Sequence, residues 1–417
     1  MFLKNSIKKI LNSRLSRAMG VSLINYDLLK YLKHYLWVFN LKKVPTLKII
    51  YNKAKEVSQE DVVLCERLIA AYRKATAERS TPENNTSLIW SEGLKRYSGK
   101  LMTVVERGNA HELALLLSRM FREDFVYGLA SGSLVEHSKS RIGSKIWSLK
   151  YQDNVVSLAE YLGLVRAEST QQGLRAYGLK DGITAVVSQI EACLGISIGF
   201  PDIGSPYGVK ANSSLITMEH PEHLYVALRI SQAARDHLNV TAGNELNLLE
   251  IGAGFGGLAY WLLKLKDLKI RTYTIIDLPL INVLQGYFLS QAFTVRQVKL
   301  YGEIDQSSAC ISILPNVAFE PAIKQDIDVL VNENSMPEMS EEIVSAYISF
   351  AKKRLRGIFF SYNHEAYSIV HGKPQVWVPE VVAQVGGFKR LGRNASWVRS
   401  GYVEEIYLNL KDKENKK

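Results

Sequence analysis

Residues 246–262 constrain the fold of this chain more than any other stretch. An apolar run over residues 246–251 predicts a buried parallel strand, and a helix-periodic segment begins at Leu258. Between them lie four glycines, Gly252, Gly254, Gly256 and Gly257. Glycines let the backbone approach a ligand closely, and the start of a helix offers unpaired N–H groups. A strand, a glycine turn and a helix in this order predict a cradle for a nucleotide cofactor.

A second apolar run covers residues 273–276 and ends in Asp277. An acidic side chain after the second strand of such a fold accepts hydrogen bonds from ribose hydroxyls. Together, the glycine turn and Asp277 predict that an adenosine-containing cofactor binds here.

Strands and helices alternate from residue 247 onward. The expected strands cover residues 247–251, 272–276, 295–300, 327–332 and 357–361, and a helix over residues 280–293 follows the second of them. This repetition predicts an α/β fold with a parallel, doubly wound, Rossmann-like sheet whose ligand lies at the carboxyl ends of the strands. Two more strands, residues 388–393 and 402–410, are expected to complete a seven-stranded sheet as an antiparallel hairpin.

The preceding half of the chain is expected to be mostly helical. Helical patterns cover residues 57–75, 110–130, 155–164 and 183–194 and carry no chemical motif, which suggests a cap or a domain that forms a homodimer.

Glycine and proline concentrate in residues 195–208, which predicts a long loop of the kind that is often functional. A helical pattern over residues 215–238 follows and carries His220 and His223 on one face. We favour surface or substrate-contacting histidines over metal ligands, because no clear third ligand lies nearby.

A length of 417 residues with 47% hydrophobic residues predicts a globular protein of two domains. We expect five segments: a basic extension (1–56), a helical domain (57–194), a substrate-side loop and helix (195–240), a cofactor domain (241–411) and a charged tail (412–417).

The net charge of +11 is concentrated at the N-terminus. Residues 1–56 hold twelve lysines and arginines and two acidic residues, a balance of +10. The pattern of apolar and basic residues near the start predicts an amphipathic helix, for which packing on its own domain is favoured and contact with an anionic membrane surface is the alternative. Nucleic acid is not an expected partner, because the basic excess is remote from the glycine turn.

Several features favour a cytoplasmic protein. Contact of its basic N-terminus with the inner face of the membrane is the alternative to a fully cytoplasmic location. Cys65, Cys193 and Cys310 are isolated and do not suggest disulfides or zinc. No apolar run approaches the ~18–20 residues that span a bilayer, and the first residues lack a secretory signal pattern.

The glycine turn fits two cofactor patterns. Gly252, Gly254 and Gly257 match the dinucleotide fingerprint G-x-G-x-x-G, whereas Glu250 with Gly252, Gly254 and Gly256 matches E-x-G-x-G-x-G, the first motif of S-adenosylmethionine-dependent methyltransferases. The late position of the sheet and its terminal hairpin favour the second pattern. Glu250 also suits a ligand with an ammonium group, whereas a pyrophosphate gains nothing from a carboxylate there.

Three segments resemble a family of sugar O-methyltransferases that is found among bacterial surface-polysaccharide genes. They are Leu-Glu-Ile-Gly-Ala-Gly-Phe-Gly-Gly-Leu-Ala from residue 249, Tyr-Thr-Ile-Ile-Asp-Leu-Pro from residue 273, and Asp-Val-Leu-Val-Asn-Glu-Asn-Ser-Met-Pro-Glu-Met from residue 328. Upstream, Leu-Ala-Glu-Tyr-Leu-Gly from residue 158 and Ile-Gly-Ser-Pro-Tyr-Gly from residue 203 look like the lead-in segments of the same family, so the resemblance covers roughly residues 155–410. Met336 and Pro337 depart from the family's pattern.

The resemblance implies a class I fold, S-adenosylmethionine as the cofactor and a sugar hydroxyl as the acceptor. It implies cofactor-binding roles for Glu250, Gly252, Gly254, Gly256, Asp277, Leu278 and Asn332. Asn334, Ser335, Asn363, Tyr207 and Arg229 are expected on the acceptor side.

Methyl transfer to a hydroxyl requires a base that takes the hydroxyl proton. His364 and Glu338, both expected at strand ends that face the cofactor, are the candidates; histidine has the more suitable ordinary pKa, near 6.5. A divalent metal held by Asp326, Asp328, Glu333 or Glu338 is an alternative way to activate the hydroxyl. An NAD-linked oxidoreductase, a methyltransferase for another small molecule and a non-catalytic binding protein of the same fold remain open.

Overall fold

A sheet of eight strands organises the protein, in the order β12-β13-β9-β8-β4-β5-β7-β6. The computed structural model describes residues 47–78, 96–137, 141–166, 182–238, 240, 244–295, 297–304, 310–365, 369–370 and 373–410. The strands are β4 (Leu246–Ile251), β5 (Ile270–Asp277), β6 (Val298–Lys299), β7 (Ile311–Pro315), β8 (Ile327–Glu333), β9 (Leu355–His364), β12 (Phe388–Ala395) and β13 (Tyr402–Asn409).

The six strands from β9 to β6 are parallel, whereas β13 pairs antiparallel with β9 and β12 antiparallel with β13. The doubly wound sheet with an antiparallel terminal hairpin is therefore confirmed. Because β4 and β8 are neighbours, the carboxyl ends of these two strands lie side by side, with Ile251 opposite Asn332.

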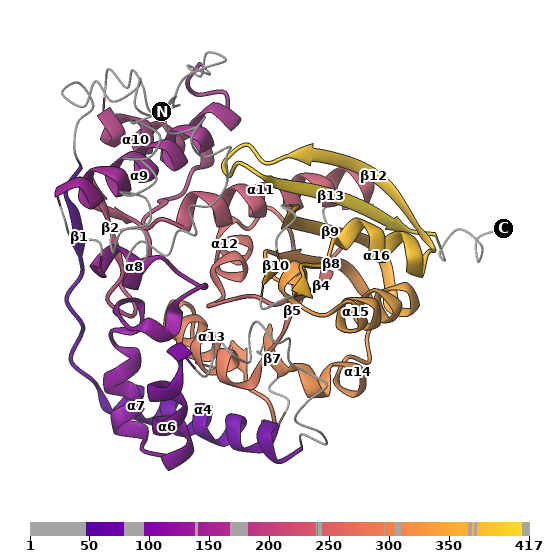
Figure 1. The fold of residues 1–417 in the computed structure, drawn as a ribbon, viewed down its shortest axis with the longest axis horizontal. Coiled ribbons are helices and arrows are strands. Elements are labelled where there is room, and N and C mark those ends of the chain that lie inside the picture. Colours follow the sequence, from indigo (N-terminus) through magenta and orange to yellow (C-terminus); the bar gives the residue numbers. More distant parts are fainter. Residues whose placement is uncertain are drawn as a thin grey trace, which may run out of the picture.

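Helices cover both faces of the sheet (Figure 1). Side chains of β4 alternate between two cores: Leu248 packs in one, while Leu249 and Ile251 pack in the other. The first core includes α11 (His220–His237), α12 (Gly257–Leu265) and α13 (Pro279–Ala292), and the second includes α15 (Glu341–Arg354) and α16 (Val378–Val385), with α14 (Phe319–Ala322) beside them.

The N-terminal half is mostly helical, as expected, and lies along the lower and left sides in Figure 1. Its described helices are α4 (Gln59–Ala77), α6 (Gly99–Arg107), α7 (Ala110–Leu117), α8 (Gly132–His137), α9 (Arg141–Tyr161) and α10 (Gly182–Leu194), with short 3-10 turns at Met120–Arg122 and Asp124–Val126.

Local sequence explains several helix ends. Ser58 forms a capping box with Asp61 at the start of α4, Asn109 caps α7, and Ser340 caps α15 by accepting a hydrogen bond from the Ile343 N–H.

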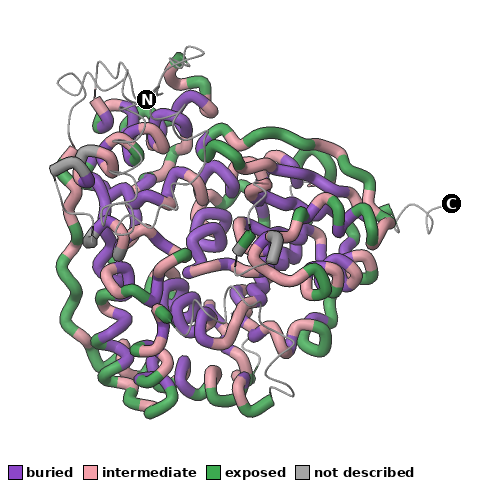
Figure 2. Tube along the Cα trace, viewed as in Figure 1, coloured by how far each residue is buried: buried purple, intermediate pink, exposed green. Residues whose placement is uncertain are grey.

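The helical half and the sheet share one hydrophobic core. Buried residues of α4, α7 and the 3-10 turns belong to the same cluster as those of α12, α13 and the sheet. Figure 2 shows buried segments both in the lower helices and in the sheet. The helical half is thus packed against α12, α13 and the sheet.

The structure differs from the sequence prediction in several places. The sheet has eight strands instead of the expected seven, the helix expected over residues 110–130 ends at Leu117, and α9 begins at Arg141 instead of residue 155. The third strand was expected at residues 295–300, but only the two-residue β6 forms there, and the longer β7 pairs with β5 instead. The apolar residues of β7 alternate toward the buried side, a pattern that fits a half-buried strand. The helix expected over residues 215–238 begins only at His220.

A further difference is a small antiparallel sheet of β1 (Ile49–Tyr51), β2 (Tyr207–Ala211) and β3 (Ser214–Ile216), which the sequence did not predict. It forms because two segments about 160 residues apart in the sequence pair with each other, with Ile49 opposite Val209.

Most of the basic extension, residues 1–46, and the tail, residues 411–417, lie outside the described residues. Within the described part of the chain, no helix combines the length and apolar character needed to cross a bilayer.

Candidate functional site

The glycine turn between β4 and α12 has the backbone conformation that its sequence requires. Gly252, Gly254 and Gly256 have φ angles of +74°, +56° and +95°, which side chains other than glycine rarely adopt. The Gly252 N–H donates to the Ile276 carbonyl at 2.9 Å, which fixes the start of the turn to β5.

Two neighbours pack so closely on the turn that they leave no room for a side chain. A Cβ at Gly252 would lie 2.1 Å from Ser335 Oγ, and one at Gly257 would lie 2.3 Å from His223 Nδ1. A Cβ at Gly254 would meet only Leu129, at 3.8 Å, so the space there belongs to the pocket.

Phe255 anchors the turn. Its side chain is 1% exposed, and its ring makes edge contacts with Phe121 and Phe288, both at 5.1 Å between ring centroids. Phe121 comes from the helical half, so this half helps to hold the glycine turn in place.

Asp277 ends β5 beside the turn. Its Oδ1 accepts a hydrogen bond from the Leu278 N–H at 2.8 Å, and its Oδ2 accepts one from the Gln285 amide at 2.7 Å. Gln285 also donates to the Gly254 carbonyl at 2.9 Å. Burial raises the pKa of Asp277 to about 7, although these hydrogen bonds and others from the backbone of the turn lower it.

The segment after β8 closes the opposite wall. Ser335 Oγ donates to the Ile251 carbonyl at 3.0 Å and accepts from the Asn332 amide at 2.5 Å. Asn334 adopts a left-handed backbone with φ +60°, and its Oδ1 is buried without a hydrogen-bond partner among the described residues. A polar atom left in this way is suited to a ligand.

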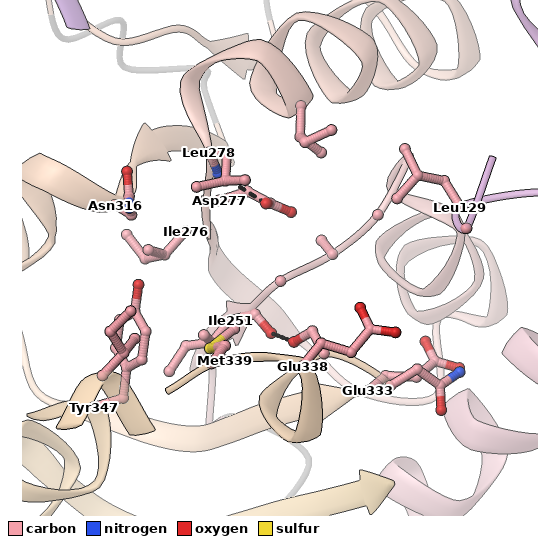
Figure 3. A pocket seen from close by; sticks show the side chains of 18 of the residues that line it. Leu129, Ile251, Ile276, Asp277, Leu278, Asn316, Glu333, Glu338, Met339 and Tyr347 are labelled. Atoms are coloured by element: carbon pink, nitrogen blue, oxygen red, sulfur yellow. Dashed lines mark hydrogen bonds between the residues drawn. The ribbon is translucent and has the colours of Figure 1, made fainter. Parts of the chain in front are cut away.

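These elements enclose a pocket with an empty volume of about 910 Å³, including the part open to solvent. In Figure 3, Asn316 and Tyr347 lie on one side and Glu333 and Glu338 on the other. Seven of the residues predicted from the sequence line it: Gly252, Gly254, Asp277, Leu278, Asn334, Ser335 and Glu338.

Gly256 and three other predicted residues lie next to the pocket but do not line it. Gly256 starts α12. Asn332 is fully buried and donates to the Ile251 carbonyl at 2.8 Å, while its Oδ1 accepts from the Asn363 amide at 2.9 Å. Glu250 is 1% exposed and accepts a hydrogen bond from the Tyr273 hydroxyl at 2.7 Å. These three side chains support the pocket from behind.

The remaining predicted residues lie elsewhere. His364 is half-buried at the end of β9, with its ring against Tyr402, and burial together with Arg399 lowers its pKa. Tyr207 belongs to the small sheet of β1, β2 and β3. Arg229 forms a salt bridge with the buried Glu404 of β13, with a shortest distance of 2.6 Å. None of the three is among the pocket-lining residues.

Sequence reasoning missed part of the pocket wall. Gly128 and Leu129 reach it from the helical half, and Tyr347 reaches it from α15. Surface or substrate contact was favoured for His220 and His223: His223 does line the pocket, whereas His220 is fully buried against Phe200 and Trp261. Glu333, named only as a metal ligand candidate, also lines the pocket. Among the described residues, no group of three His, Cys, Asp or Glu side chains could hold a metal ion.

The pocket is acidic. Asp277, Glu333 and Glu338 line it, and no lysine or arginine is among its described lining residues. Behind the wall, burial and the nearby Asp277 raise the pKa of Glu250 to about 8, although its hydrogen bond from Tyr273 lowers it. Glu250 Oε1 has no hydrogen-bond partner among the described residues. Such a site suits a ligand that carries positive charge.

No protein-family model matches the chain, and no curated protein sequence matches it. Solved structures with similarity to it include mitomycin 7-O-methyltransferase, at 11% identity and a TM-score of 0.35, over 83% of this chain and 94% of that chain.

Two others are the magnesium protoporphyrin IX methyltransferase of Synechocystis PCC 6803 and the ribosomal protein L11 methylase of Lactobacillus delbrueckii subsp. bulgaricus. The first has 12% identity and a TM-score of 0.33, over 46% of this chain and 81% of that chain. The second has 11% identity and a TM-score of 0.30, over 46% and 79%. Similarities this distant leave the activity to be inferred from the residues of the site.

Proposed function

We propose that this protein is an S-adenosylmethionine-dependent O-methyltransferase whose acceptor is a sugar hydroxyl. One observation carries the cofactor assignment: the glycine turn opens into a pocket lined by three carboxylates and, among its described residues, by no lysine or arginine. A pyrophosphate, as in NAD, would find no cation to pair with among these residues, whereas a sulfonium or an ammonium group would favour the ionised form of the carboxyl groups and pair with it.

The pocket residues fit the parts of this cofactor. Asp277 is proposed to hold the ribose, and Leu278, with the apolar Ile281 and Ile343 nearby, the adenine. The turn at Gly252 and Gly254 is proposed to hold the methionine portion, supported from behind by Glu250, Asn332 and Asn363.

When bound, S-adenosylmethionine supplies a methyl group on a positively charged sulfur. The protein's task is then to align an acceptor oxygen with that group, to exclude water and to accept the hydroxyl proton. Glu338, Asn334 and Ser335 line the pocket and are proposed to face the acceptor. The sugar assignment rests on the resemblance of residues 249–259, 273–279 and 328–339 to sugar O-methyltransferases.

Titration calorimetry with S-adenosylmethionine, S-adenosylhomocysteine and NAD tests the cofactor assignment. We expect both sulfur compounds to bind and NAD not to bind. Binding of NAD alone would favour the oxidoreductase, and failure of both sulfur compounds to bind would refute the proposal.

Incubation with radiolabelled S-adenosylmethionine and a panel of nucleotide sugars tests the acceptor. Label recovered in a sugar supports the assignment, whereas label in a different small molecule would redirect it. Cofactor binding without transfer to any acceptor would favour a non-catalytic binding protein.

For the basic extension, whose residues 1–56 carry a charge of +10, we propose packing on its own domain, with contact with anionic lipid on the inner face of the membrane as the alternative. Co-flotation with phosphatidylglycerol vesicles separates the two. Equal flotation of the full chain and of the chain without residues 1–40 supports packing, whereas flotation of the full chain alone supports lipid contact. Sedimentation of the same two proteins reports whether the chain forms a homodimer.

A further inference from the structure

His223 and Glu333 lie next to each other at the pocket, although nothing in the sequence was a reason to place these two residues together. His223 lies on the first turn of α11, and Glu333 is the last residue of β8. His223 Nε2 and Glu333 Oε2 are 3.9 Å apart, and both residues line the pocket.

Both side chains are incompletely satisfied. The side chain of His223 is 15% exposed and that of Glu333 is 6% exposed. His223 Nδ1 and Glu333 Oε1 are buried and have no hydrogen-bond partner among the described residues. Buried polar groups are rarely left unpaired unless a ligand or water completes them.

The position of His223 is tightly determined. Its ring lies 5.4 Å from the ring of Phe255, and it occupies the space that a side chain at Gly257 would fill. The histidine is therefore held against the cofactor turn itself.

Charged and titratable groups on five elements act on this pair. Glu222 of α11 and Glu250 of β4 raise the pKa of the Glu333 carboxyl, and the Arg399 guanidinium at the tip of the terminal hairpin lowers it. The Glu333 carboxyl in turn raises the pKa of Tyr273 in β5 and of Tyr362 in β9. Glu333 also raises the pKa of Tyr402 in β13, and His223 lowers the pKa of His220 in α11. Arg399 is already bound to Glu222 through contacts of 3.0 and 2.9 Å.

These surroundings determine the protonation of the pair without a ligand. Burial, together with Glu222 and Glu250, raises the pKa of Glu333 well above its usual value, and Arg399 opposes this only in part. Burial and Arg399 lower the pKa of His223 to about 3. The Glu333 carboxyl is therefore shifted toward its protonated form, and the imidazole of His223 is neutral at neutral pH.

We propose that Glu333 releases its proton when the positive charge of the cofactor enters the pocket, and that His223, then beside a carboxylate, accepts the proton of the acceptor hydroxyl. This inference rests on the proposed function and names its base. It assigns to His223 the role that sequence analysis gave to His364 or Glu338.

The chemistry balances. The acceptor oxygen forms a bond to the methyl carbon while the carbon–sulfur bond breaks, and the electron pair of that bond remains on sulfur. The hydroxyl proton passes to His223 Nε2, and the imidazolium is neutralised by the Glu333 carboxylate. Loss of the sulfonium charge therefore coincides with the gain of a charge on the histidine.

Proton release on binding tests this inference without an acceptor. Titration calorimetry of the full chain at pH 7, in phosphate and in Tris, yields the number of protons released, because the two buffers differ in ionisation enthalpy. We expect S-adenosylmethionine to release more protons than the uncharged sulfur of S-adenosylhomocysteine, by roughly half a proton or more.

Substitution isolates the carboxyl. Glu333→Gln should reduce this difference, leaving only the part that Asp277 and Glu250 contribute, whereas the matched change at the exposed Glu341, Glu341→Gln, should leave it as in the unsubstituted protein. Undiminished release by Glu333→Gln would overturn the proposal. If the unsubstituted protein binds neither sulfur compound, the proposed function fails instead, so the two failures are distinguishable.

A second measurement needs no variant and serves if Glu333→Gln does not fold. Between pH 6 and 8 the affinity of the unsubstituted protein for S-adenosylmethionine should rise by up to about tenfold per pH unit, because the ligand binds the deprotonated carboxyl. The affinity for S-adenosylhomocysteine should rise less. Equal slopes for the two compounds would contradict the inference.

Discussion

Two acidic side chains at the carboxyl end of the sheet, Glu250 and Glu333, are buried, although acidic side chains are usually exposed to solvent. Glu250 is 1% exposed and Glu333 is 7% exposed, yet neither forms a close salt bridge with a lysine or arginine among the described residues. Burial of an unpaired charge is costly, and the protein avoids this cost by keeping the carboxyls protonated. Because these carboxyls favour their protonated form, we expect the ligand-free protein to lose stability as the pH rises.

The first prediction concerns this pH dependence. The pKa of Glu250 is raised to about 8 and that of Asp277 to about 7, so above pH 6.5 the folded state holds more protons than the unfolded chain. The unfolding free energy of the ligand-free protein should thus fall from pH 6.5 to 8, by at most ~1.4 kcal/mol per pH unit for each group. His223 has the opposite sign, but its effect on stability lies between its folded pKa of about 3 and its unfolded pKa near 6.5, below this pH range.

Urea unfolding at pH 6.5, 7.25 and 8 measures this slope. Glu250→Gln should flatten it, whereas Glu66→Gln, an exposed change in α4, should not. A slope that is unchanged by Glu250→Gln would show that this carboxyl is ionised in the folded protein.

The second prediction separates ligand contact from backbone strain. Gly254 and Gly163 have φ angles of +56° and +71°, and a side chain at either would meet no protein atom closer than 3.8 Å. Alanine at either position should cost ~1–2 kcal/mol of stability through the left-handed backbone. Only Gly254→Ala places a methyl group in the pocket, so it alone should weaken S-adenosylmethionine binding, by at least about tenfold. Equal affinities of the two variants in calorimetry would place the cofactor elsewhere.

At the scale of elements, α11 connects the pocket with the terminal hairpin. One turn presents His223 to the pocket, and two turns later Arg229 binds Glu404 of β13. The Glu404 carboxylate is 1% exposed and also accepts hydrogen bonds from Tyr225 and Asn394. The antiparallel hairpin is thus fastened to the helix that carries the proposed base.

The third prediction tests this fastening. Arg229→Met leaves a buried carboxylate without its cation and should lower the unfolding free energy by ~3–5 kcal/mol. Arg235 on the same helix contacts Asp267 at 3.4 Å with both side chains more than a third exposed, so Arg235→Met should cost at most ~1 kcal/mol. Chemical denaturation of both variants measures the two losses of unfolding free energy. Similar losses would mean that solvent screens the Arg229–Glu404 pair as it screens an exposed pair.

At the scale of the whole molecule, one core joins the helical half to the sheet. Phe121 of the helical half, Phe200 of the loop before β2, Phe255 of the glycine turn and Phe288 of α13 form an aromatic cluster. Because Phe255 belongs to the glycine turn, we expect a change in the helical half to alter the affinity for the proposed cofactor.

The fourth prediction compares the two cores. Phe121→Ala and Phe359→Ala each remove a buried ring and should each cost ~3–5 kcal/mol of stability. Phe121→Ala should also weaken S-adenosylmethionine binding severalfold, because it removes a support of Phe255. Phe359 packs on Tyr407 in the other core, and its loss should change binding less. Equal effects on affinity in calorimetry would argue against support of the turn by the helical half.

The strand, glycine turn and following helix at residues 246–265 could be read from the sequence because they are consecutive and their signals are local. Apolar runs identify buried strands, glycines mark the left-handed turn, and Asp277 follows from its place after the next strand. The parallel, doubly wound arrangement and the terminal hairpin followed from the alternation of strands and helices, whereas the order of the strands was not predicted. The strand expected at residues 295–300 is reduced to the two residues of β6, and β7 was not predicted.

Distance along the chain explains what the sequence could not determine. His223 and Glu333 are far apart in sequence and meet only because α11 packs beside the end of β8; Gly128 and Leu129 reach the pocket from the helical half for the same reason. Burial was equally hidden: Glu250, Asn332 and Asn363 carry polar groups that suggest ligand contacts, yet the packing of neighbouring strands places them behind the wall. The sequence alone therefore determined the sheet and the cofactor turn, and tertiary packing decided which side chains face the ligand.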